Sequence, residues 1–280
     1  MDGMKTWTTA KIREAKGNRK LPCLTAYDYT TARIMDEAGI PLILVGDSLG
    51  NTMLGYANTL PVTLDQMLHH TAAVARAAAS ALVVADMPFL TYQISDEQAL
   101  ANAGRLIQEG GADAVKIEGG GSRVRRVERL TDCGIPVLAH LGLTPQSVNQ
   151  FGGFKVQGKR EDDARRLLDD AVALAGAGAF AVVLECIPAP LARTVTETIP
   201  VPTIGIGAGP FCDGQILVYH DMLGLNDTFR PTFVKQYAEL AATMRQAFAA
   251  YAQEVGDGTF PDAGHSFGMK PPRAPEPPRA

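Results

Sequence analysis

Acidic side chains come at the ends of several short apolar runs, where strands are expected to end. Asp47 follows LILVG, Asp86 follows LVVA, and Glu118 closes AVKIE. Three carboxylates that converge repel one another, and a divalent cation relieves that repulsion. Oxygen ligands without a thiolate favour Mg²⁺ over zinc. These residues therefore indicate a magnesium site, unless each acid instead caps a helix or pairs with a base inside the protein.

A lysine lies two residues before the last of these acids. In AVKIEGG, Lys116 and Glu118 share one face of a strand, while Val115 and Ile117 share the other. The ammonium group can hold a substrate carboxylate or keto oxygen, and it can also pair with Glu118. A desolvated lysine can form a Schiff base. Acids nearby keep the amine protonated, so Schiff-base chemistry is disfavoured.

A further acid, Glu185, ends the apolar run AVVLE. Burial raises the pKa of a carboxyl group, as a general base working near neutral pH requires. The alternative is a buried carboxylate that caps a backbone group. Cys186 follows directly and is expected on the opposite face of the strand. His140 and His220 lie near strand ends and are expected to contact site residues rather than substrate.

The elements that must position these groups are short apolar runs alternating with helical segments. Helical patterns cover 63–79, 95–110 and 160–178, and a last helix is expected over 231–254. Strands that alternate with helices predict a parallel sheet, and nearly continuous apolar strands predict cover on both faces. The eight expected strands are 22–28, 42–48, 82–89, 114–120, 136–142, 181–188, 202–209 and 216–224.

Eight strands at even spacing favour a (β/α)8 TIM barrel, and an open doubly wound sheet is the alternative. Polar residues gather at the carboxyl ends of the runs, and in a barrel all these ends converge on one mouth. In an open sheet only those near the switch point would meet. The polar residues are Asp28, Asp47, Ser48, Asp86, Lys116, Glu118, His140, Glu185, His220 and Asp221.

Two long connections, residues 49–62 and 141–159, are rich in Gly and polar groups. Such segments after barrel strands are candidate lids over the mouth, or plain surface loops. The stretch GIGAG (205–209) offers backbone N–H groups to an anion, although the signal is weak and a tight turn is the favoured explanation.

Composition excludes several classes of protein. The 280 residues are 46% hydrophobic and carry a formal net charge of −4, which argues against disorder and against nucleic-acid binding. The four cysteines form no C-x-x-C pair, so reduced thiols in a cytoplasmic protein are expected. The N-terminus lacks the apolar core of a signal peptide. Gly, Glu and Pro interrupt the apolar stretch from Leu174 to Ala192, so no membrane span is expected.

The chain divides into one catalytic domain and a tail. Residues 1–255 are expected to form a single barrel domain. Residues 256–280 contain six prolines and are expected to be extended and flexible.

Several segments, in order, resemble the ketopantoate (3-methyl-2-oxobutanoate) hydroxymethyltransferase family. Each piece alone is modest evidence, but the ordered set is specific and covers about residues 5–255. The matching segments are LTAYD (24–28), VGDSLG (45–50), VADMPF (84–89), KIEGG (116–120), HLGLTPQ (140–146), FGGFKVQGK (151–159), LECIP (184–188) and IGIGAGPFCDGQILVYHDMLG (204–224).

The resemblance implies a barrel of the phosphoenolpyruvate/pyruvate-like superfamily that requires Mg²⁺. It implies transfer of a one-carbon unit from 5,10-methylenetetrahydrofolate to 3-methyl-2-oxobutanoate through a Mg-stabilised enolate. The product is 2-dehydropantoate, in the first step of pantothenate biosynthesis. A homo-oligomer, a decamer built as a pentamer of dimers, is also implied.

The resemblance also carries roles to individual residues of this chain. Asp47, Asp86 and Glu118 match the metal site, and Asp47, Ser48, Asp86 and Lys116 match substrate contacts. Glu185 matches the proton acceptor, and His140 is expected beside these groups. Two other readings stay open. One is a Mg²⁺-dependent lyase or phosphoenolpyruvate mutase, which the expected direction of Cys186 disfavours. The other is a barrel that only binds partners.

Overall fold

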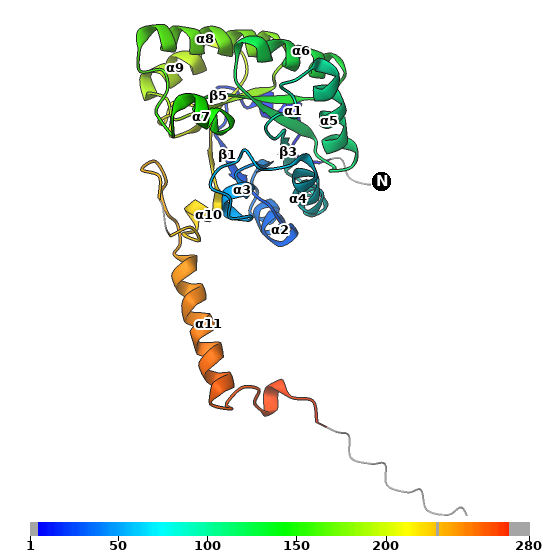
Figure 1. Cartoon of the computed structure of the whole chain (residues 1–280), viewed down its shortest axis with the longest axis vertical. Coiled ribbons are helices and arrows are strands. Elements are labelled where there is room, and N and C mark those ends of the chain that lie inside the picture. The colour runs from blue at the N-terminus through cyan, green and yellow to red at the C-terminus, as the bar shows by residue number, and fades with distance from the viewer. Residues whose placement is uncertain (1–4, 228–229, 269–280) are drawn as a thin grey trace, which may run out of the picture.

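Eight parallel strands close into a barrel in the computed structural model, which describes residues 5–227 and 230–268 (Figure 1). Each strand pairs with the next in the sequence, and β1 pairs with β8. The predicted barrel is therefore confirmed, and the open sheet is excluded. The strands are β1 (Leu21–Thr25), β2 (Leu42–Val45), β3 (Leu82–Asp86), β4 (Ala114–Glu118), β5 (Val137–Gly142), β6 (Ala181–Glu185), β7 (Thr203–Ile206) and β8 (Gly214–Leu217).

Helices cover most of the outside of this barrel (Figure 1). Their starts are encoded locally. Thr63 and Gln66 form a reciprocal capping box at α4, and the Asp28 carboxylate accepts the Thr31 N–H at 2.9 Å to cap α2. Asp28 is thus a helix cap. The helices are α1 (Thr9–Glu14), α2 (Tyr29–Glu37), α3 (Leu49–Thr52), α4 (Leu64–Ala77), α5 (Asp96–Gln108), α6 (Val124–Asp132), α7 (Val148–Phe151), α8 (Glu161–Gly176), α9 (Ala189–Thr198), α10 (Tyr219–Met222) and α11 (Leu240–Gly256), with 3₁₀ turns at Gly121–Arg123, Pro145–Ser147 and Ala263–His265.

The alternation of side chains along the strands produces two cores. Inward residues such as Leu42, Val84 and Ile204 fill the barrel. Outward residues such as Ile43 and Val83 pack against the helices. Because both faces of most strands are covered, apolar residues run almost without a break, as the sequence predicted.

A buried carboxylate holds several segments together at the amino-terminal end of the barrel. Asp213 Oδ1 accepts the Gly17 N–H at 3.1 Å, and Oδ2 accepts Lys16 Nζ and the Thr203 N–H, both at 2.9 Å. Hydrogen bonds and the Lys16 charge hold the pKa of Asp213 below its usual value, although burial acts in the opposite direction. This carboxylate ties the segment after α1 to β7.

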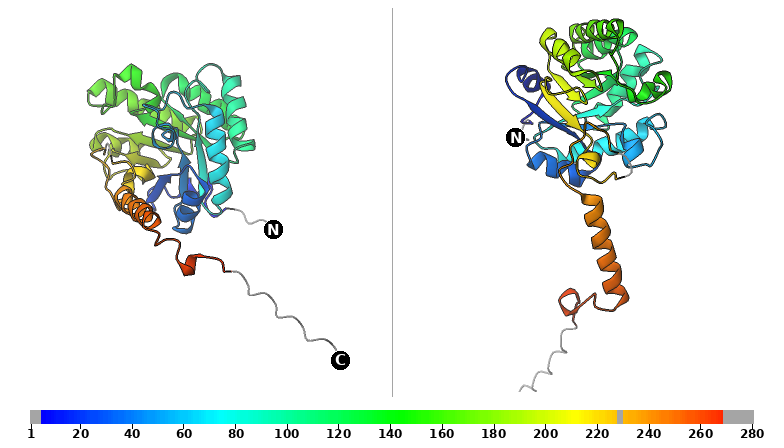
Figure 2. Two further views of the ribbon diagram at one scale, coloured as in Figure 1. Left: turned by 60° about the horizontal axis from the view of Figure 1, so that its bottom comes forward. Right: turned by 90° about the vertical axis from the view of Figure 1, so that its left-hand side faces the viewer.

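The last part of the chain departs from the expected pattern. Strand β8 ends at Leu217, and residues within 216–224 form α10 instead of a longer strand. The next helix, α11, begins at Leu240 rather than near residue 231, and none of its residues is buried. Figure 2 shows it projecting from the barrel instead of packing on it. Outward residues Pro22 and Gln215 on β1 and β8 are exposed as a result.

The Pro-rich tail falls mostly outside the described residues, since residues 269–280 are not described. Across residues 5–227 and 230–268, no helix combines the length and apolar character needed to cross a bilayer.

Candidate functional site

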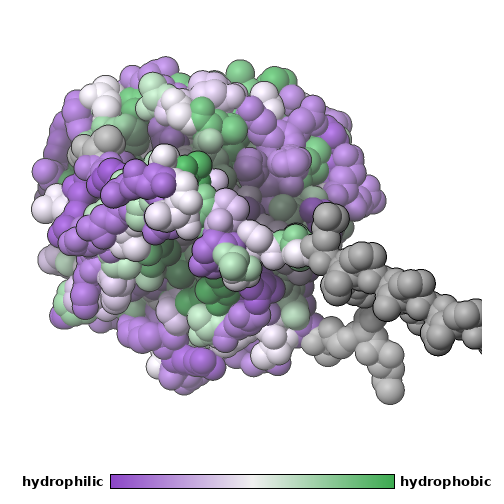
Figure 3. All heavy atoms as spheres, turned by 90° about the horizontal axis from the view of Figure 1, so that it is seen from below, coloured by the Kyte–Doolittle hydropathy of each residue, from purple (hydrophilic) through white to green (hydrophobic). Residues whose placement is uncertain are grey.

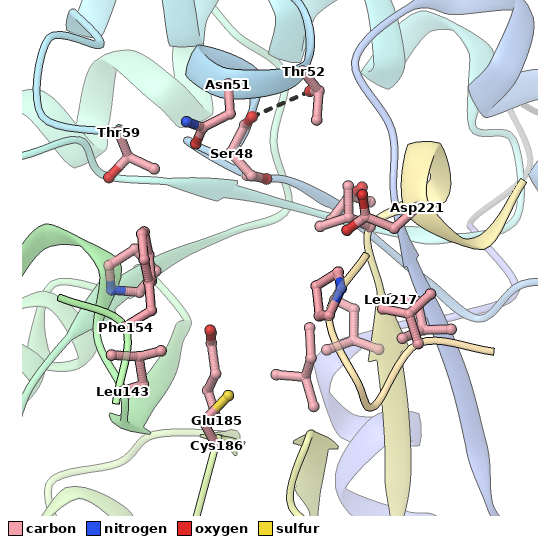
Figure 4. Close-up of a pocket in the computed structure, with 18 of the residues that line it drawn as sticks. Ser48, Asn51, Thr52, Thr59, Leu143, Phe154, Glu185, Cys186, Leu217 and Asp221 are labelled. Carbon is pink, nitrogen blue, oxygen red and sulfur yellow. Dashed lines mark hydrogen bonds between the residues drawn. The ribbon is translucent and has the colours of Figure 1, made fainter. Parts of the chain in front are cut away.

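A cavity of about 900 Å³ opens at the carboxyl ends of the strands. Loops from both sides of the barrel line it, with Ser48 and Asn51 facing Glu185, Cys186 and Phe154 across the space (Figure 4). Both long connections contribute lining residues, among them Tyr56 and Phe154. The predicted strand-end residues that line it are Asp47, Ser48, Asp86, Lys116, Glu118, His140, Glu185 and Asp221.

Asp86 and Lys116 form the shortest ion pair among the acids at the bottom of this cavity. Lys116 Nζ lies 2.5 Å from Asp86 Oδ1 and 3.6 Å from Glu118 Oε1. Asp86 Oδ2 accepts the Asp47 N–H at 2.9 Å, so the loop after β2 is held by the end of β3. All four side chains are buried. The structure brings Asp47, Asp86, Lys116 and Glu118 together, as the strand-end argument predicted.

The charges in this cluster do not balance. Burial and the carboxylates of Asp86 and Glu118 raise the pKa of Asp47 well above its usual value. Burial also raises the pKa of Asp86, although Lys116 opposes the shift. The three carboxylates raise the pKa of Lys116 despite its burial, so the amine stays protonated and Schiff-base chemistry is disfavoured.

No described group of three or more His, Cys, Asp or Glu side chains stands ready as a set of metal ligands. Lys116 and a glutamine amide hold the carboxylates instead. The donor set still fits a hard divalent cation, because three buried carboxylates face a single lysine, and burial together with the charges of Asp86 and Glu118 raises the pKa of Asp47. Asp47, Asp86 and Glu118 are the residues that would hold it, and this assignment stays a prediction.

Gln146 is a buried contact of the acids that was not predicted from the sequence. Its Nε2 donates to Asp47 Oδ2 and to the Met87 carbonyl, both at 2.9 Å, and its backbone N–H donates to Glu118 Oε2 at 3.0 Å. It lies in the 3₁₀ turn after β5. The only signal in the sequence was its place at the end of HLGLTPQ.

Ser48 contacts a buried tyrosine. Its hydroxyl lies 2.7 Å from the Tyr27 hydroxyl. Burial raises the pKa of Tyr27, so the phenol keeps its proton. A Cβ on Gly46 would lie 2.8 Å from Ser48 Oγ, so glycine at this position makes room for the serine side chain.

His140 links the acid cluster to Glu185. Its Nδ1 lies 3.4 Å from Glu118 Oε1 and its Nε2 lies 3.2 Å from Glu185 Oε2, although neither nitrogen has good hydrogen-bond geometry. Burial and Lys116 lower the pKa of His140, but the two carboxylates outweigh them and raise it to about 9. Glu185 is less buried than predicted, with 17% of its side chain exposed, because it faces the open cavity.

The expected direction of Cys186 is wrong. Cys186 lines the cavity, and its side chain lies beside Glu185 in Figure 4. Strand β6 ends at Glu185, and Cys186 has a left-handed backbone with φ of 48°, which breaks the alternation of faces. Burial and the nearby Glu185 charge raise the pKa of its thiol to about 12, so it is a poor nucleophile at neutral pH.

The GIGAG stretch packs tightly against neighbouring side chains. A Cβ on Gly207 would lie 2.8 Å from the Phe233 ring, and one on Gly209 would lie 2.4 Å from Ala189 Cβ. Both glycines have positive φ. These contacts explain the glycines without an anion, and an anion site there stays a prediction. His220 does not line the cavity and packs on the ring of Tyr219.

The family model of ketopantoate hydroxymethyltransferase matches residues 6–263. The chain belongs to this family. The predicted resemblance is therefore confirmed, and the chain is an enzyme of the transferase class. Two proteins named 3-methyl-2-oxobutanoate hydroxymethyltransferase are close relatives. That of Moorella thermoacetica is 60% identical over 248 residues, covering 89% of this chain and 92% of its own. The protein of Syntrophus aciditrophicus is 58% identical, and the match covers 93% of this chain and 96% of the relative.

Solved structures with the same fold are more distant. A phosphoenolpyruvate phosphomutase from Streptomyces platensis subsp. rosaceus has a TM-score of 0.60 at 16% identity, covering 90% of this chain and 88% of its own. A 2,3-dimethylmalate lyase of the phosphoenolpyruvate mutase/isocitrate lyase superfamily has a TM-score of 0.61 at 18% identity, covering 90% and 86%. These likenesses concern the fold alone, and they agree with the predicted (β/α)8 barrel.

Proposed function

We propose that this enzyme converts 3-methyl-2-oxobutanoate to 2-dehydropantoate, with 5,10-methylenetetrahydrofolate as the one-carbon donor, in the first step of pantothenate biosynthesis. Family membership supports the reaction class. The observation that carries the proposal is the placement of Glu185 across one cavity from a cluster of three carboxylates and a lysine. Such a cavity separates a proton acceptor from the groups that hold the oxygens of a keto acid.

The acid cluster is the proposed binding place of the keto acid. Asp47, Asp86 and Glu118 would hold Mg²⁺, which when bound supplies positive charge that acidifies the C3–H of a 2-keto acid. Lys116 and Ser48 would donate hydrogen bonds to the substrate carboxylate and keto oxygens. Tyr27 keeps its own proton and contacts Ser48 Oγ at 2.7 Å, so it can donate to Ser48 and leave the serine proton for the substrate.

Glu185 is the proposed proton acceptor. A carboxylate oxygen takes the C3 proton, the electron pair moves to the keto oxygen, and an enolate results. Water hydrolyses both C–N bonds of the folate methylene, which gives tetrahydrofolate and a formaldehyde equivalent. The enolate carbon then bonds to the formaldehyde carbon as its C=O π bond breaks, and the resulting alkoxide takes up a proton to become the product hydroxyl. Water supplies the hydroxyl oxygen of the product. His140, 3.2 Å from Glu185 Oε2, can hold this carboxylate in place before and after the transfer.

The outer part of the cavity is the proposed place of the folate. Exposed aromatic rings of Phe154 and Phe233 line it, and rings of this kind stack on a flat heterocycle. Gln157 N–H donates to the Cys186 carbonyl at 2.9 Å, which holds the segment carrying Phe154 beside Glu185. Lys155 also lines the cavity and forms no ion pair with any described residue, so it can meet a folate carboxylate.

The test is product formation from both substrates in D₂O, followed by NMR with Mg²⁺ and with excess chelator. The proposal expects 2-dehydropantoate only when the metal is present. Deuterium entering C3 without product would mean that enolisation occurs and that the donor is wrong. If a folded, Mg²⁺-loaded sample forms no product and takes up no deuterium at C3, the transferase proposal is overturned. Cleavage of a malate-type substrate in that sample would favour a lyase instead.

We also propose a cytoplasmic homo-oligomer, a decamer built as a pentamer of dimers, with no nucleic-acid or membrane partner. Exposed apolar side chains repeat along one face of α11 at Met244, Phe248, Tyr251 and Val255. Seen from the end to which α11 points, apolar patches lie within a largely hydrophilic surface (Figure 3). A second copy of the chain that covers this helix face would remove that apolar surface from water.

A further inference from the structure

We propose that Gln146 and Tyr92 form a positioning pair that holds the carboxylates of Asp47 and Glu118 in one arrangement for the ligand of the cavity. The inference depends on the proposed function, because it concerns the same carboxylates. It assigns a role to two buried residues that come from different loops and carry no charge. Gln146 is 6% exposed and Tyr92 is 1% exposed.

The orientation of the Gln146 amide follows from its neighbours. Its nitrogen lies 2.9 Å from the Met87 carbonyl, which can only accept. The NH₂ group must therefore point to Met87 and Asp47, and the amide oxygen must point the other way. That oxygen lies 2.8 Å from the Tyr92 hydroxyl and 3.2 Å from Gln93 Nε2, both of which can donate. A single orientation of the amide therefore satisfies all four neighbouring groups.

The direction of the Tyr92 hydroxyl follows in the same way. Its oxygen accepts the backbone N–H of Glu118 at 3.1 Å. Its single proton has the Gln146 oxygen at 2.8 Å, whereas the alternative acceptor, the Glu118 carbonyl, is at 3.4 Å. A phenol keeps its proton at neutral pH. Tyr92 is anchored in turn, because Arg126 Nε donates to its carbonyl at 3.1 Å.

One continuous chain of hydrogen bonds results, from the Glu118 N–H through Tyr92 and the Gln146 amide to Asp47 Oδ2. The Gln146 backbone N–H returns to Glu118 Oε2 at 3.0 Å. The pair therefore joins the ends of β2 and β4 through the loops after β3 and β5. Two carboxylates that repel each other are kept close by donors that are themselves fixed.

The test is a double-mutant cycle on the full-length protein. Gln146→Met keeps the side-chain length and removes both amide groups, and Tyr92→Phe keeps the ring and removes the hydroxyl. Mg²⁺ affinity is measured by calorimetry without substrate. Each single variant is expected to bind Mg²⁺ more weakly, by about 10- to 100-fold for Gln146→Met. The double variant is expected to lose less than the product of the two single losses.

The controls separate positioning from general damage. Gln215→Met, an exposed glutamine on β8, is expected to bind Mg²⁺ as the wild type does. Circular dichroism and melting temperature report whether each variant folds. If Gln146→Met fails to fold, Tyr92→Phe alone must still weaken Mg²⁺ binding. The proposed pair would be overturned if a folded single variant bound Mg²⁺ with unchanged affinity. It would also be overturned if the affinity loss of the double variant equalled the product of the two single losses.

A second readout keeps the inference apart from the metal assignment. If the wild type binds no Mg²⁺, that part of the proposed function is wrong. The wild type, the two single variants and the double variant are then compared by their dissociation constants for 3-methyl-2-oxobutanoate. Weaker binding in both single variants, with a less-than-multiplicative double variant, supports the pair without any metal, and equal constants overturn it.

Discussion

Lys116 Nζ and Asp86 Oδ1 lie 2.5 Å apart, and both side chains are almost wholly buried. The same amine lies 3.6 Å from Glu118, so one cation faces two carboxylates from adjacent strands. Two buried negative charges that share this amine make this end of the barrel dependent on the lysine. The ion pair also prevents the amine from acting as a nucleophile.

Replacing Lys116 by Met is expected to destabilise the protein by about 3 kcal/mol, because buried carboxylates lose their counter-charge. Added Mg²⁺ should raise the melting temperature of the variant more than that of the wild type. Thermal unfolding with and without Mg²⁺ measures both effects. Lys155→Met, in the outer part of the cavity, is the matched control and should unfold as the wild type does. An unchanged melting temperature in Lys116→Met would contradict this account.

Glu185→Gln is expected to lower kcat by about 10²- to 10⁴-fold, the usual contribution of a general base. Binding of 3-methyl-2-oxobutanoate should persist, because the acid cluster that holds it is unchanged. Deuterium exchange at C3, followed by NMR, isolates the proton-transfer step. Glu197→Gln, an exposed position on α9, controls for charge. Full exchange activity in Glu185→Gln would remove the residue from the role of base.

Cys186 should resist alkylation although it faces the cavity. A thiol pKa of about 12 leaves almost no thiolate at neutral pH, and the thiolate is the reactive form. The exposed Cys133 provides an internal reference in the same chain. Peptide mapping by mass spectrometry after timed iodoacetamide treatment is expected to show Cys133 modified well before Cys186. Faster modification of Cys186 would indicate an activated thiol and would strengthen the lyase alternative.

Asp213→Asn is expected to cost about 2 kcal/mol at pH 7, because buried donors lose their charged acceptor. The folded-state pKa of Asp213 lies below the usual 3.8, so its stabilisation is complete above that value and is lost as the pH falls through the folded pKa. The difference between variant and wild type should therefore be constant from pH 7 to about pH 5 and narrow below about pH 4. Melting temperatures across this range test the sign. The exposed Asp169→Asn should show no such difference.

Charged residues on the apolar face of α11 are expected to break the assembly. Phe248→Glu with Tyr251→Glu places two carboxylates on the face where a second copy is proposed to pack. Light scattering after size-exclusion chromatography should then give a smaller particle. Gln246→Glu with Gln253→Glu adds the same charge on the opposite side of the helix and should leave the mass unchanged. A wild-type protein that is already monomeric would refute the proposed oligomer.

The barrel and much of the site could be predicted because both follow from regular periodicities. Lys116 and Glu118 share a face by the two-residue period of a strand, and Asp47 and Asp86 follow neighbouring strands. Parallel pairing of β2, β3 and β4 then brings them together. The C-terminal helix was misplaced because its apolar residues resemble those of a helix packed on a barrel. A periodic pattern predicts a buried face without indicating which chain covers it.

The remaining residues depend on loop conformation, which has no period to follow. Cys186 reaches the cavity through a left-handed backbone at a residue other than glycine. Gln146 reaches Asp47 from 99 positions away in the sequence, across three intervening strands. Neither arrangement follows from residue type or spacing. Uncharged polar residues that bridge loops are for this reason the part of an active site most easily overlooked.

The isolation of α11 also has a thermodynamic consequence. The helix is attached to the barrel at its start, where the Leu240 N–H donates to the Leu223 carbonyl at 2.9 Å, and its 17 residues have no buried side chain. A helix that buries none of its side chains lacks the tertiary packing that supplies most helical stability in proteins. Its folding is then coupled to association by mass action. The helical content of this protein should therefore fall on dilution while the barrel stays folded. The amount of secondary structure then depends on the protein concentration.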